Sequence, residues 1–252
     1  MRTIDVYMPS GGRFGTPAVI PLREMNLREK KILYNKPRFE QIVKMVGDCI
    51  VDKSVNVNDL YLYDYMSLFV NLRVITMGND YTFPVSCRQC GFSQPVEVDL
   101  SDLEILEASD GAEAQFNVDV LDDEGNVEHV YTCSHITVGE QIKLNRRIIK
   151  KRSGRKPFTE GDEWIFGIAS RIKAIDGETV GDPDMIVSQL ENLPSSVSDA
   201  LEDGIAAQDF GIRFSIAHEC HSCGYSTIIP INITSEFFFR RRNFGAAHKS
   251  LS

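Results

Sequence analysis

This 252-residue sequence lacks several features of membrane, secreted and common catalytic proteins. No segment approaches the roughly 18 consecutive apolar residues that a transmembrane helix requires. Residues 1–10 lack the positively charged and then apolar arrangement of a signal peptide. The sequence also has no Gly-x-Ser-x-Gly elbow, phosphate-binding loop, dinucleotide fingerprint or His-Glu-x-x-His motif. These absences predict a non-enzymatic protein of a reducing cytoplasm, without a membrane span.

Basic residues are fewer than acidic ones. The chain has 27 Lys and Arg against 36 Asp and Glu, which gives a formal net charge of −9 and disfavours non-specific binding to nucleic acid. Residues 91–129 contain twelve acidic residues and no Lys or Arg, whereas residues 143–156 contain eight basic residues and no acidic one. We expect the basic run to be a solvated helix face or to dock on an acidic surface, with the chain's own acidic stretch as one candidate.

The apolar and turn patterns predict an α+β fold. Helices are expected at residues 27–35, with Asn26 and Glu29 as a capping box, and at residues 37–52, 59–78, 138–152, 163–173, 184–193 and 195–210. The helix at 59–78, capped by Asn58 or Asp59, is apolar nearly all round, which predicts burial. Strands are expected at residues 18–22, 81–85, 95–100, 212–217 and 226–233, with a hairpin at 114–120 and 127–133.

These elements divide the chain into four regions that we expect to form one intertwined domain. They are an N-terminal strand and helical region (1–80), a first cysteine segment with an acidic β-hairpin (81–135), a helical region (136–211), and a second cysteine segment with an aromatic and basic tail (212–252). The tail places three phenylalanines before three arginines at residues 237–242. We expect an interface there, with a split between core and rim as the alternative.

Two segments share the pattern strand, Cys-x-x-Cys-Gly-aromatic, strand. The first contains Cys87 and Cys90, and the second contains Cys220 and Cys223. Two sulfurs at this spacing can bind one metal ion from a tight turn, and the glycine that follows tolerates a positive φ. Two such knuckles that face each other complete a tetrahedral four-sulfur site, as in a zinc ribbon. The sequence therefore predicts a structural Zn2+ ion held by all four cysteines.

The two cysteine pairs are far apart for a zinc ribbon. A free-standing ribbon places roughly 15–20 residues between its pairs, whereas 129 residues separate Cys90 from Cys220. Loop-closure entropy grows only logarithmically with length, so the pairs can meet if the insert folds with its ends close together. The predicted fold is a helical domain combined with a zinc-ribbon-like β-hairpin module, in which the ion joins the front of the chain to its end.

Other interpretations of the cysteines and histidines are less favoured. Two unrelated hairpin turns with incidental cysteines would leave the repeated pattern unexplained. The cysteines of a redox Cys-x-x-Cys motif lie at the start of a helix, whereas a strand is expected after each pair here. A catalytic zinc ion needs an open coordination position, which four thiolates do not leave. His218 and His221 are candidates to replace a cysteine ligand, but we expect them at the surface or behind the ligands. We expect Cys49 to be a core thiol. Cys133 and His135 are a weaker metal hint, for which a core position at a strand end is favoured.

Several segments form a pattern that extends in order over nearly the whole chain. They are Pro-Ser-Gly-Gly at 9–12, residues 21–30, Cys-Ile-Val-Asp at 49–52, residues 59–73, Tyr-Thr-Phe at 81–83 leading to Cys-Arg-Gln-Cys-Gly at 87–91, Ile-Asp-Gly-Glu at 175–178, Cys-His-Ser-Cys-Gly at 220–224, and residues 231–239. Together they resemble the baseplate hub and tail-assembly proteins of T-even-type, contractile-tailed bacteriophages. The acidic stretch after Leu100 is the least similar part.

This resemblance implies a non-enzymatic, zinc-stabilised protein that binds other phage baseplate or tail proteins, such as those of the hub, the tail tube or the tape measure. It implies a location in the virion, at the tail baseplate, and in the host cytoplasm during assembly. The alternative function is a zinc-ribbon regulator that binds nucleic acid. The overall acidity, and the lack of a basic face near the cysteine pairs, count against this alternative. A metalloenzyme is disfavoured because four sulfur ligands close the coordination shell.

Overall fold

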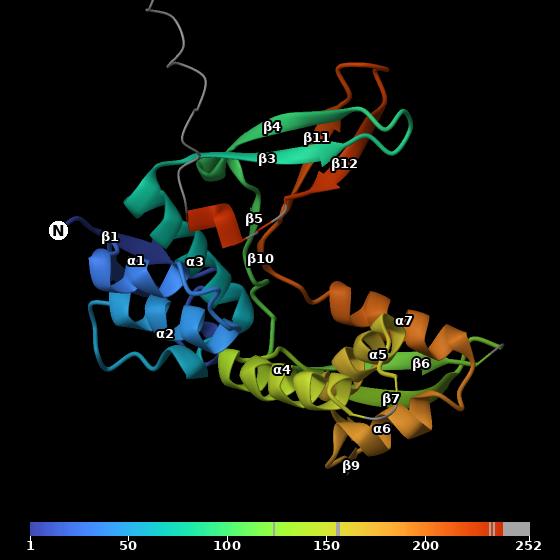
Figure 1. Cartoon of the computed structure of the whole chain (residues 1–252). Helices are drawn as coiled ribbons and strands as arrows, with labels where there is room; N and C mark the ends of the chain where they lie inside the picture. The colour runs from blue at the N-terminus through green and yellow to red at the C-terminus, as the bar shows by residue number, and fades with distance from the viewer. Residues whose placement is uncertain (123, 155–156, 232, 234, 239–252) are drawn as a thin grey trace, which may run out of the picture.

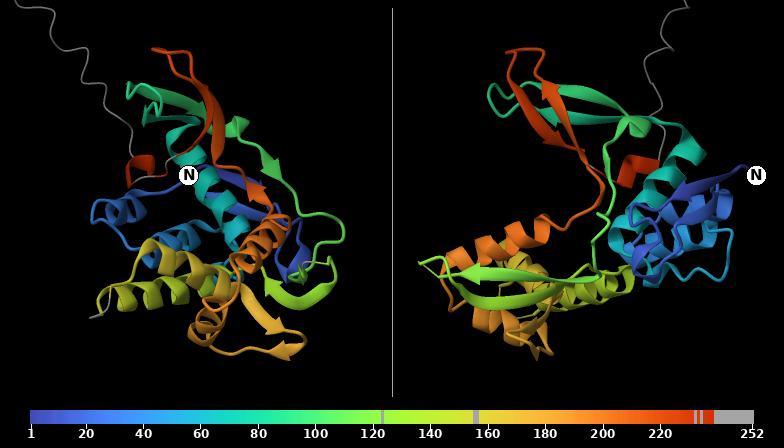
Figure 2. Two further views of the ribbon diagram at one scale, coloured as in Figure 1. Left: turned by 90° about the vertical axis from the view of Figure 1, so that its right-hand side faces the viewer. Right: turned by 180° about the vertical axis from the view of Figure 1, so that it is seen from behind.

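The computed structural model describes residues 1–122, 124–154, 157–231, 233 and 235–238. The fold is α+β, as predicted. Figure 1 shows an N-terminal body in blue and cyan, a second body of green strands with yellow and orange helices, and two hairpins, green and red, that extend to a common end. Figure 2 shows these parts from the side and from behind. Within the described residues, no helix has both the length and the apolar character needed to cross a membrane.

In the N-terminal body, a β-hairpin and the second of two helices pack against the long helix α3, Leu62–Met77, and the first helix packs against the second. The hairpin pairs β1 (Thr3–Tyr7) with β2 (Val19–Arg23), and the helices are α1 (Leu27–Leu33) and α2 (Phe39–Cys49). The side chains of Leu68 and Leu72 in α3 are fully buried, because its apolar residues surround the helix axis instead of forming one stripe. The predicted burial of this helix is confirmed, whereas strand β1 was not predicted.

Helices α2 and α3 begin later than predicted. The prediction for α3 placed its cap at residue 58 or 59, but the helix begins at Leu62. The Leu60 carbonyl accepts a hydrogen bond from the Val138 N–H at 2.9 Å, which holds the chain extended up to the helix. Helix α2 was expected to have Pro37 in its first turn, but its capping residue is Arg38 and the helix begins at Phe39, so Pro37 lies before the helix.

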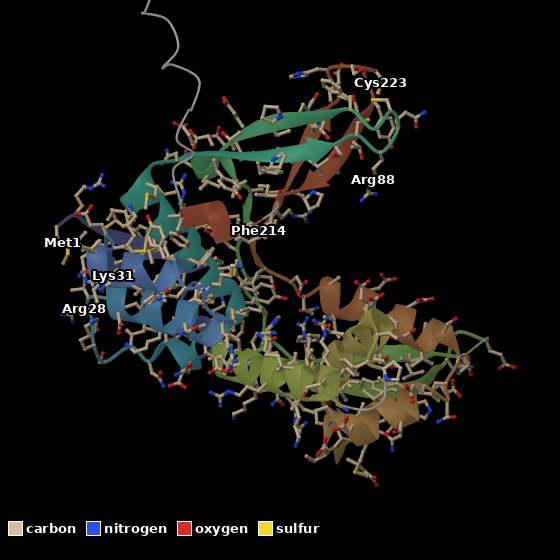
Figure 3. The ribbon with its side chains drawn as sticks, in the orientation of Figure 1. Met1, Arg28, Lys31, Arg88, Phe214 and Cys223 are labelled. Atoms are coloured by element: carbon tan, nitrogen blue, oxygen red, sulfur yellow. The ribbon has the colours of Figure 1, made fainter. Side chains whose placement is uncertain are left out.

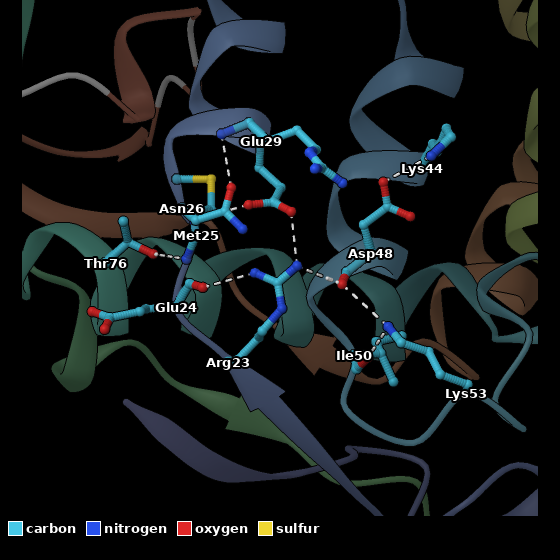
Figure 4. Close-up of polar contacts among 11 residues, drawn as sticks. Arg23, Glu24, Met25, Asn26, Glu29, Lys44, Asp48, Ile50, Lys53 and Thr76 are labelled. Carbon is cyan, nitrogen blue, oxygen red and sulfur yellow. Dashed lines mark hydrogen bonds and ion pairs between the residues drawn. The ribbon is translucent and has the colours of Figure 1, made fainter. Parts of the chain in front are cut away.

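A largely buried ion pair joins β2 to α1 and α2 (Figure 4). The Arg23 Nη2 group donates hydrogen bonds to Glu29 Oε1 at 2.7 Å and to the Asp48 carbonyl at 2.8 Å. The other carboxylate oxygen of Glu29 accepts the Asn26 N–H at 2.8 Å, which forms part of the predicted capping box of α1. One carboxylate therefore both caps a helix and neutralises an arginine that is mostly shielded from water.

The second body is a four-stranded antiparallel sheet with helices packed on it. Its strand order is β6 (Gln115–Leu121), β7 (Val127–Ser134), β8 (Ile172–Ile175) and β9 (Glu178–Thr179). Helices α5 (Glu160–Arg171), α6 (Pro183–Leu190) and α7 (Ser195–Ala206) share a separate hydrophobic core with this sheet. Helix α4, Val138–Arg152, has the predicted bounds and contacts α2, α3 and α5, so it links the two bodies.

The basic residues of α4 pair with acidic residues on neighbouring helical segments. Arg146 donates to both carboxylate oxygens of Glu40, at 2.7 and 2.8 Å. Arg147 pairs with Asp182 at 3.2 Å. In the described part of the chain, the ion pairs of this run do not involve the acidic stretch at 91–129, so that candidate partner was wrong. Exposed pairs of this kind contribute little to stability, because water and dissolved salt screen the attraction between the charges.

Two further hairpins extend from the N-terminal body. They are β3 (Asp80–Ser86) with β4 (Ser93–Asp99), and β11 (Ser215–Glu219) with β12 (Ser226–Pro230). Phe83, Val96, Ile229 and Ile231 anchor them in the main hydrophobic core. The chain leaves this region at β5 (Ile105–Leu106) and returns beside it at β10 (Gly211–Ile212), because the two segments pair as antiparallel strands. The long insert therefore has its ends close together, as the cysteine spacing required.

The first aromatic residues of the tail belong to the core. Phe237 and Phe238 are only 1% and 3% exposed, in a short 3-10 turn, Ser235–Phe238. The Phe237 ring stacks on Phe69 of α3 at 5.3 Å between centroids and meets Tyr81 edge-on at 4.9 Å. The predicted interface is therefore wrong for these two side chains, because the turn lays both on α3. Residues 239–242 of that prediction lie outside the described residues.

Candidate metal centre

The two cysteine segments form matching turns at the ends of their hairpins. In the first, the Cys87 N–H donates to the Phe92 carbonyl and the Gly91 N–H donates to the Cys87 carbonyl, both at 2.9 Å. In the second, the Cys220 and Gly224 N–H groups make the equivalent hydrogen bonds. Gly91 and Gly224 have φ angles of 72° and 68°, a left-handed conformation that glycine adopts without steric cost. The repeated sequence pattern therefore encodes one repeated turn.

The structure brings the four predicted sulfur atoms together. The Sγ atoms of Cys87 and Cys223 are 3.8 Å apart, those of Cys90 and Cys220 are 3.7 Å apart, and all four lie within 4.8 Å of one another. A tetrahedral ion with Zn–S bonds of about 2.3 Å requires sulfur separations of about 3.8 Å. A disulfide requires about 2.05 Å. The donor set and its spacing therefore fit a tetrahedral metal ion.

The sulfur atoms influence one another's ionisation. Hydrogen bonds from the backbone N–H groups of Cys90 and Gln89 lower the pKa of Cys87 to about 7. The Tyr225 N–H favours the Cys223 thiolate, but burial and the three neighbouring sulfurs outweigh it and raise the pKa of Cys223 to about 12. The Cys87 thiolate therefore forms readily near neutral pH, whereas the neighbouring sulfurs oppose ionisation of Cys223. A cation bound among the four sulfurs would favour the thiolate form of each of them.

Gln94, which the sequence analysis did not single out, connects the two hairpins behind the sulfurs. Its side chain is 6% exposed, and its Oε1 atom accepts a hydrogen bond from the backbone N–H of His221 at 3.0 Å. Its Nε2 atom lies 2.8 Å from His218 Nε2. Nothing in the local sequence marks this glutamine, because its partners are more than a hundred residues away. His218 lies beside this link, half-buried, and the His221 side chain is exposed.

The other two cysteines lie in hydrophobic cores. Cys49 and Cys133 are both fully buried, and burial raises the pKa of Cys49 to about 12 and that of Cys133 to about 11. His135 is buried among aromatic rings, which include Phe14 and Phe116. In the described part of the chain, the four hairpin cysteines are the one group of three or more His, Cys, Asp or Glu residues that is close enough to hold a metal ion.

The sulfur cluster lies far from the N-terminal body. Figure 3 shows Cys223 and Arg88 at the tip of the paired hairpins and Arg28, Lys31 and Met1 at the opposite side of the molecule. The hairpins therefore meet at two places, in the core at their base and at the cysteines at their tip. This arrangement connects residues that are 136 positions apart in sequence, Cys87 and Cys223.

The fold and site thus define a large α+β chain in which two cysteine segments, 129 residues apart in the sequence, meet in a four-cysteine cluster. The chain belongs to the family described as T4 bacteriophage base plate protein, whose model matches residues 1–239. No curated protein and no solved structure matched it. The match confirms the family resemblance seen in the sequence. Family membership makes this a structural baseplate component of the phage tail, with other tail proteins as its partners.

Proposed function

We propose that the chain is a structural or assembly component of the baseplate hub region, which binds other hub, tail-tube or tape-measure proteins and catalyses no reaction. It acts in the host cytoplasm during assembly and is located in the virion at the tail baseplate. The observation that carries this proposal is the family match over residues 1–239, which includes both cysteine pairs and the insert between them.

The second part of the proposal is a structural Zn2+ ion bound by Cys87, Cys90, Cys220 and Cys223. The sulfur separations of 3.7 and 3.8 Å support it, because they equal the edge of a tetrahedral zinc–thiolate site. Zinc supplies no reaction here; four thiolates leave no position for water or substrate. The two knuckles would form a zinc-ribbon-like module, in which Gln94 holds the second turn against the first hairpin.

We further propose that residues 1–80, 81–135, 136–211 and 212–252 act as regions of one intertwined unit. Two observations support this. The main core contains residues from β1, α3, both cysteine hairpins and the 3-10 turn at Ser235–Phe238. Helix α4 also contacts both bodies. A metal clasp at the hairpin tips would therefore stabilise a unit whose parts are already interlocked at the base.

Complementation of a phage that lacks this chain tests the functional proposal. We expect Cys220→Ser to reduce the yield of complete tails, because the hairpins separate when the ion is lost. Gln89→Ser is the matched control, since it changes an exposed side chain in the first turn without removing a sulfur. The proposal would be contradicted if the phage formed normal tails without the chain, or if Cys220→Ser gave complete tails at normal yield.

No observation favours the nucleic-acid-binding alternative. The described residues of the cysteine segments, 87–91 and 220–224, contain one arginine and no lysine, and the chain is acidic overall. A filter-binding assay with duplex and single-stranded DNA at moderate salt separates the two functions. We expect no retention of DNA, and retention that depends on the cysteines would favour the regulator.

A further inference from the structure

A groove of about 490 Å3 opens between the two cysteine hairpins. Strand β3 lines one side and strand β12 lines the other. Its apolar lining includes Phe83, Val85, Ile229 and Ile231, and the Ile228 side chain at its edge is 73% exposed. An exposed isoleucine beside an open apolar groove is typical of a surface that another molecule covers.

The backbone on both sides of this groove is available for strand pairing. In each hairpin the cysteine N–H marks a hydrogen-bonded pair, Cys87 with Phe92 and Cys220 with Tyr225. Along an antiparallel ladder, hydrogen-bonded residue pairs alternate with non-hydrogen-bonded pairs, whose N–H and C=O groups point outward. In these registers Ser86 and Ile228 belong to non-hydrogen-bonded pairs, so their N–H groups point away from their own hairpins. Within the described residues, β3 pairs with β4 alone and β12 pairs with β11 alone. Each hairpin therefore presents a free edge to the groove.

Prolines limit where a strand can be added. Pro84 and Pro230 occupy outward-facing positions on these two edges and have no N–H to donate. Beside Pro230, Ile228 offers an outward N–H and an outward carbonyl, and this carbonyl accepts a long hydrogen bond of 3.5 Å from the Thr227 hydroxyl. The β12 edge next to Ile228 is therefore the better place for an added strand, and the prolines restrict the register of pairing.

The charge of the groove indicates what such a strand carries. Arg88 is the one Lys or Arg among the described residues that line the groove, and no Asp or Glu is among them. Its side chain is exposed at the hairpin tip (Figure 3). A cation at the end of an apolar groove, without an acidic neighbour in its lining, is complementary to a carboxylate.

We propose that this groove binds an extended, mainly apolar segment of another baseplate or tail protein, which pairs with the β12 edge and places a carboxylate against Arg88. The inference rests on the proposed metal clasp, because the groove exists only while the two hairpins are joined. Apolar side chains of the segment enter between Val85 and Ile229, and its backbone bonds to Ile228.

Fluorescence anisotropy of the full zinc-loaded chain with two labelled peptides tests this proposal. The peptides are Glu-Val-Thr-Val-Thr-Val-Glu and its counterpart with Lys at both ends. We expect the Glu peptide to bind about tenfold more tightly than the Lys peptide, and Arg88→Glu to reverse the order. Ile228→Asp should weaken binding of the Glu peptide about tenfold or more, whereas Ile149→Asp, an exposed isoleucine of α4, should not change it.

Zinc content, measured on each variant, separates the two proposals. If the purified unmodified chain contains no zinc, the metal clasp is refuted. If it contains zinc but binds neither peptide, the groove proposal alone is refuted. Equal binding of the two peptides would also overturn it. A chain that ends at Phe238 and binds the Glu peptide much more tightly would show that residues 239–252 are the occupant instead. A dimer that the Glu peptide dissociates would show that the occupant is a second copy.

Discussion

Replacing His135 with phenylalanine should remove one source of acid sensitivity from the fold. The His135 side chain is 2% exposed, and neither ring nitrogen has a hydrogen-bond partner among the described residues. The rings of Phe14, Phe116 and Phe210 surround it, with centroids 5.7, 5.1 and 5.1 Å away. Burial, followed by the positive charge of Arg171, lowers the pKa of His135 to about 4.

The sign and size of the effect follow from the two pKa values. An unfolded histidine has a pKa of about 6.5, so between about pH 6.5 and 4 the unfolded chain holds the proton that the folded chain excludes. The free energy of unfolding therefore falls as the pH falls through this window, and His135 contributes no further change below it. At about 1.4 kcal/mol for each pKa unit, the loss is about 3 kcal/mol.

Urea unfolding of the unmodified chain and of His135→Phe, at intervals from pH 7.5 to 4, measures this effect. Phenylalanine fills the same aromatic site without a titratable group, so any change in packing adds a constant offset. Loss of metal in acid affects both proteins alike and cancels in the difference. We expect the difference in unfolding free energy to shift by about 3 kcal/mol in favour of the variant between pH 6.5 and 4. A difference that stays constant over this range would refute the reasoning.

Three further predictions concern the packing of the core and the link between the hairpins. Phe237→Ala should lower the free energy of unfolding, measured in urea, by about 3–5 kcal/mol, because its ring is buried against α3. The control Phe92→Ala removes a ring that is 45% exposed and should change this free energy by less than about 1 kcal/mol. Gly204→Ala should lower the free energy of unfolding by about 1–3 kcal/mol despite the higher helix propensity of alanine, since a Cβ there would lie 2.5 Å from Val118 Cγ1. An unchanged melting temperature in thermal unfolding would contradict this prediction and show that α7 shifts to accept the methyl group. Gln94→Leu should speed release of zinc to a chelator at unchanged secondary structure, and an unchanged release rate would contradict its role in joining the hairpins.

Local patterns predicted the elements whose signals are local. The helix at Val138–Arg152 is one example, and the structure shows a capping box of Thr137 and Glu140 at its start and basic residues in its last turn. The two cysteine turns are another, since the Cys-x-x-Cys-Gly pattern contains the donors and the glycine that the turn requires. Local patterns also gave the hairpin of β6 and β7, whose turn residues lie between two alternating segments.

The features that were missed depend on contacts between distant residues. Phe237 looked like part of an exposed aromatic tail, but its partner Phe69 lies in α3 and its partner Tyr81 lies in β3. Gln94 gained its importance only from His218 and His221, on the other hairpin. The first residue of α3 depended on a hydrogen bond between Leu60 and Val138. No pattern within a short window contains such information, because long-range packing overrides local preference.

Metal analysis combined with X-ray absorption at the zinc edge tests the central claim most directly. For the purified chain we predict one zinc ion bound by four sulfur atoms at about 2.3 Å. Cys87→Ser and Cys220→Ser should each lose the ion and several kcal/mol of stability, whereas Gln89→Ser should keep both. A chain without tightly bound metal, or cysteine variants that retain the ion and the melting temperature, would contradict the account.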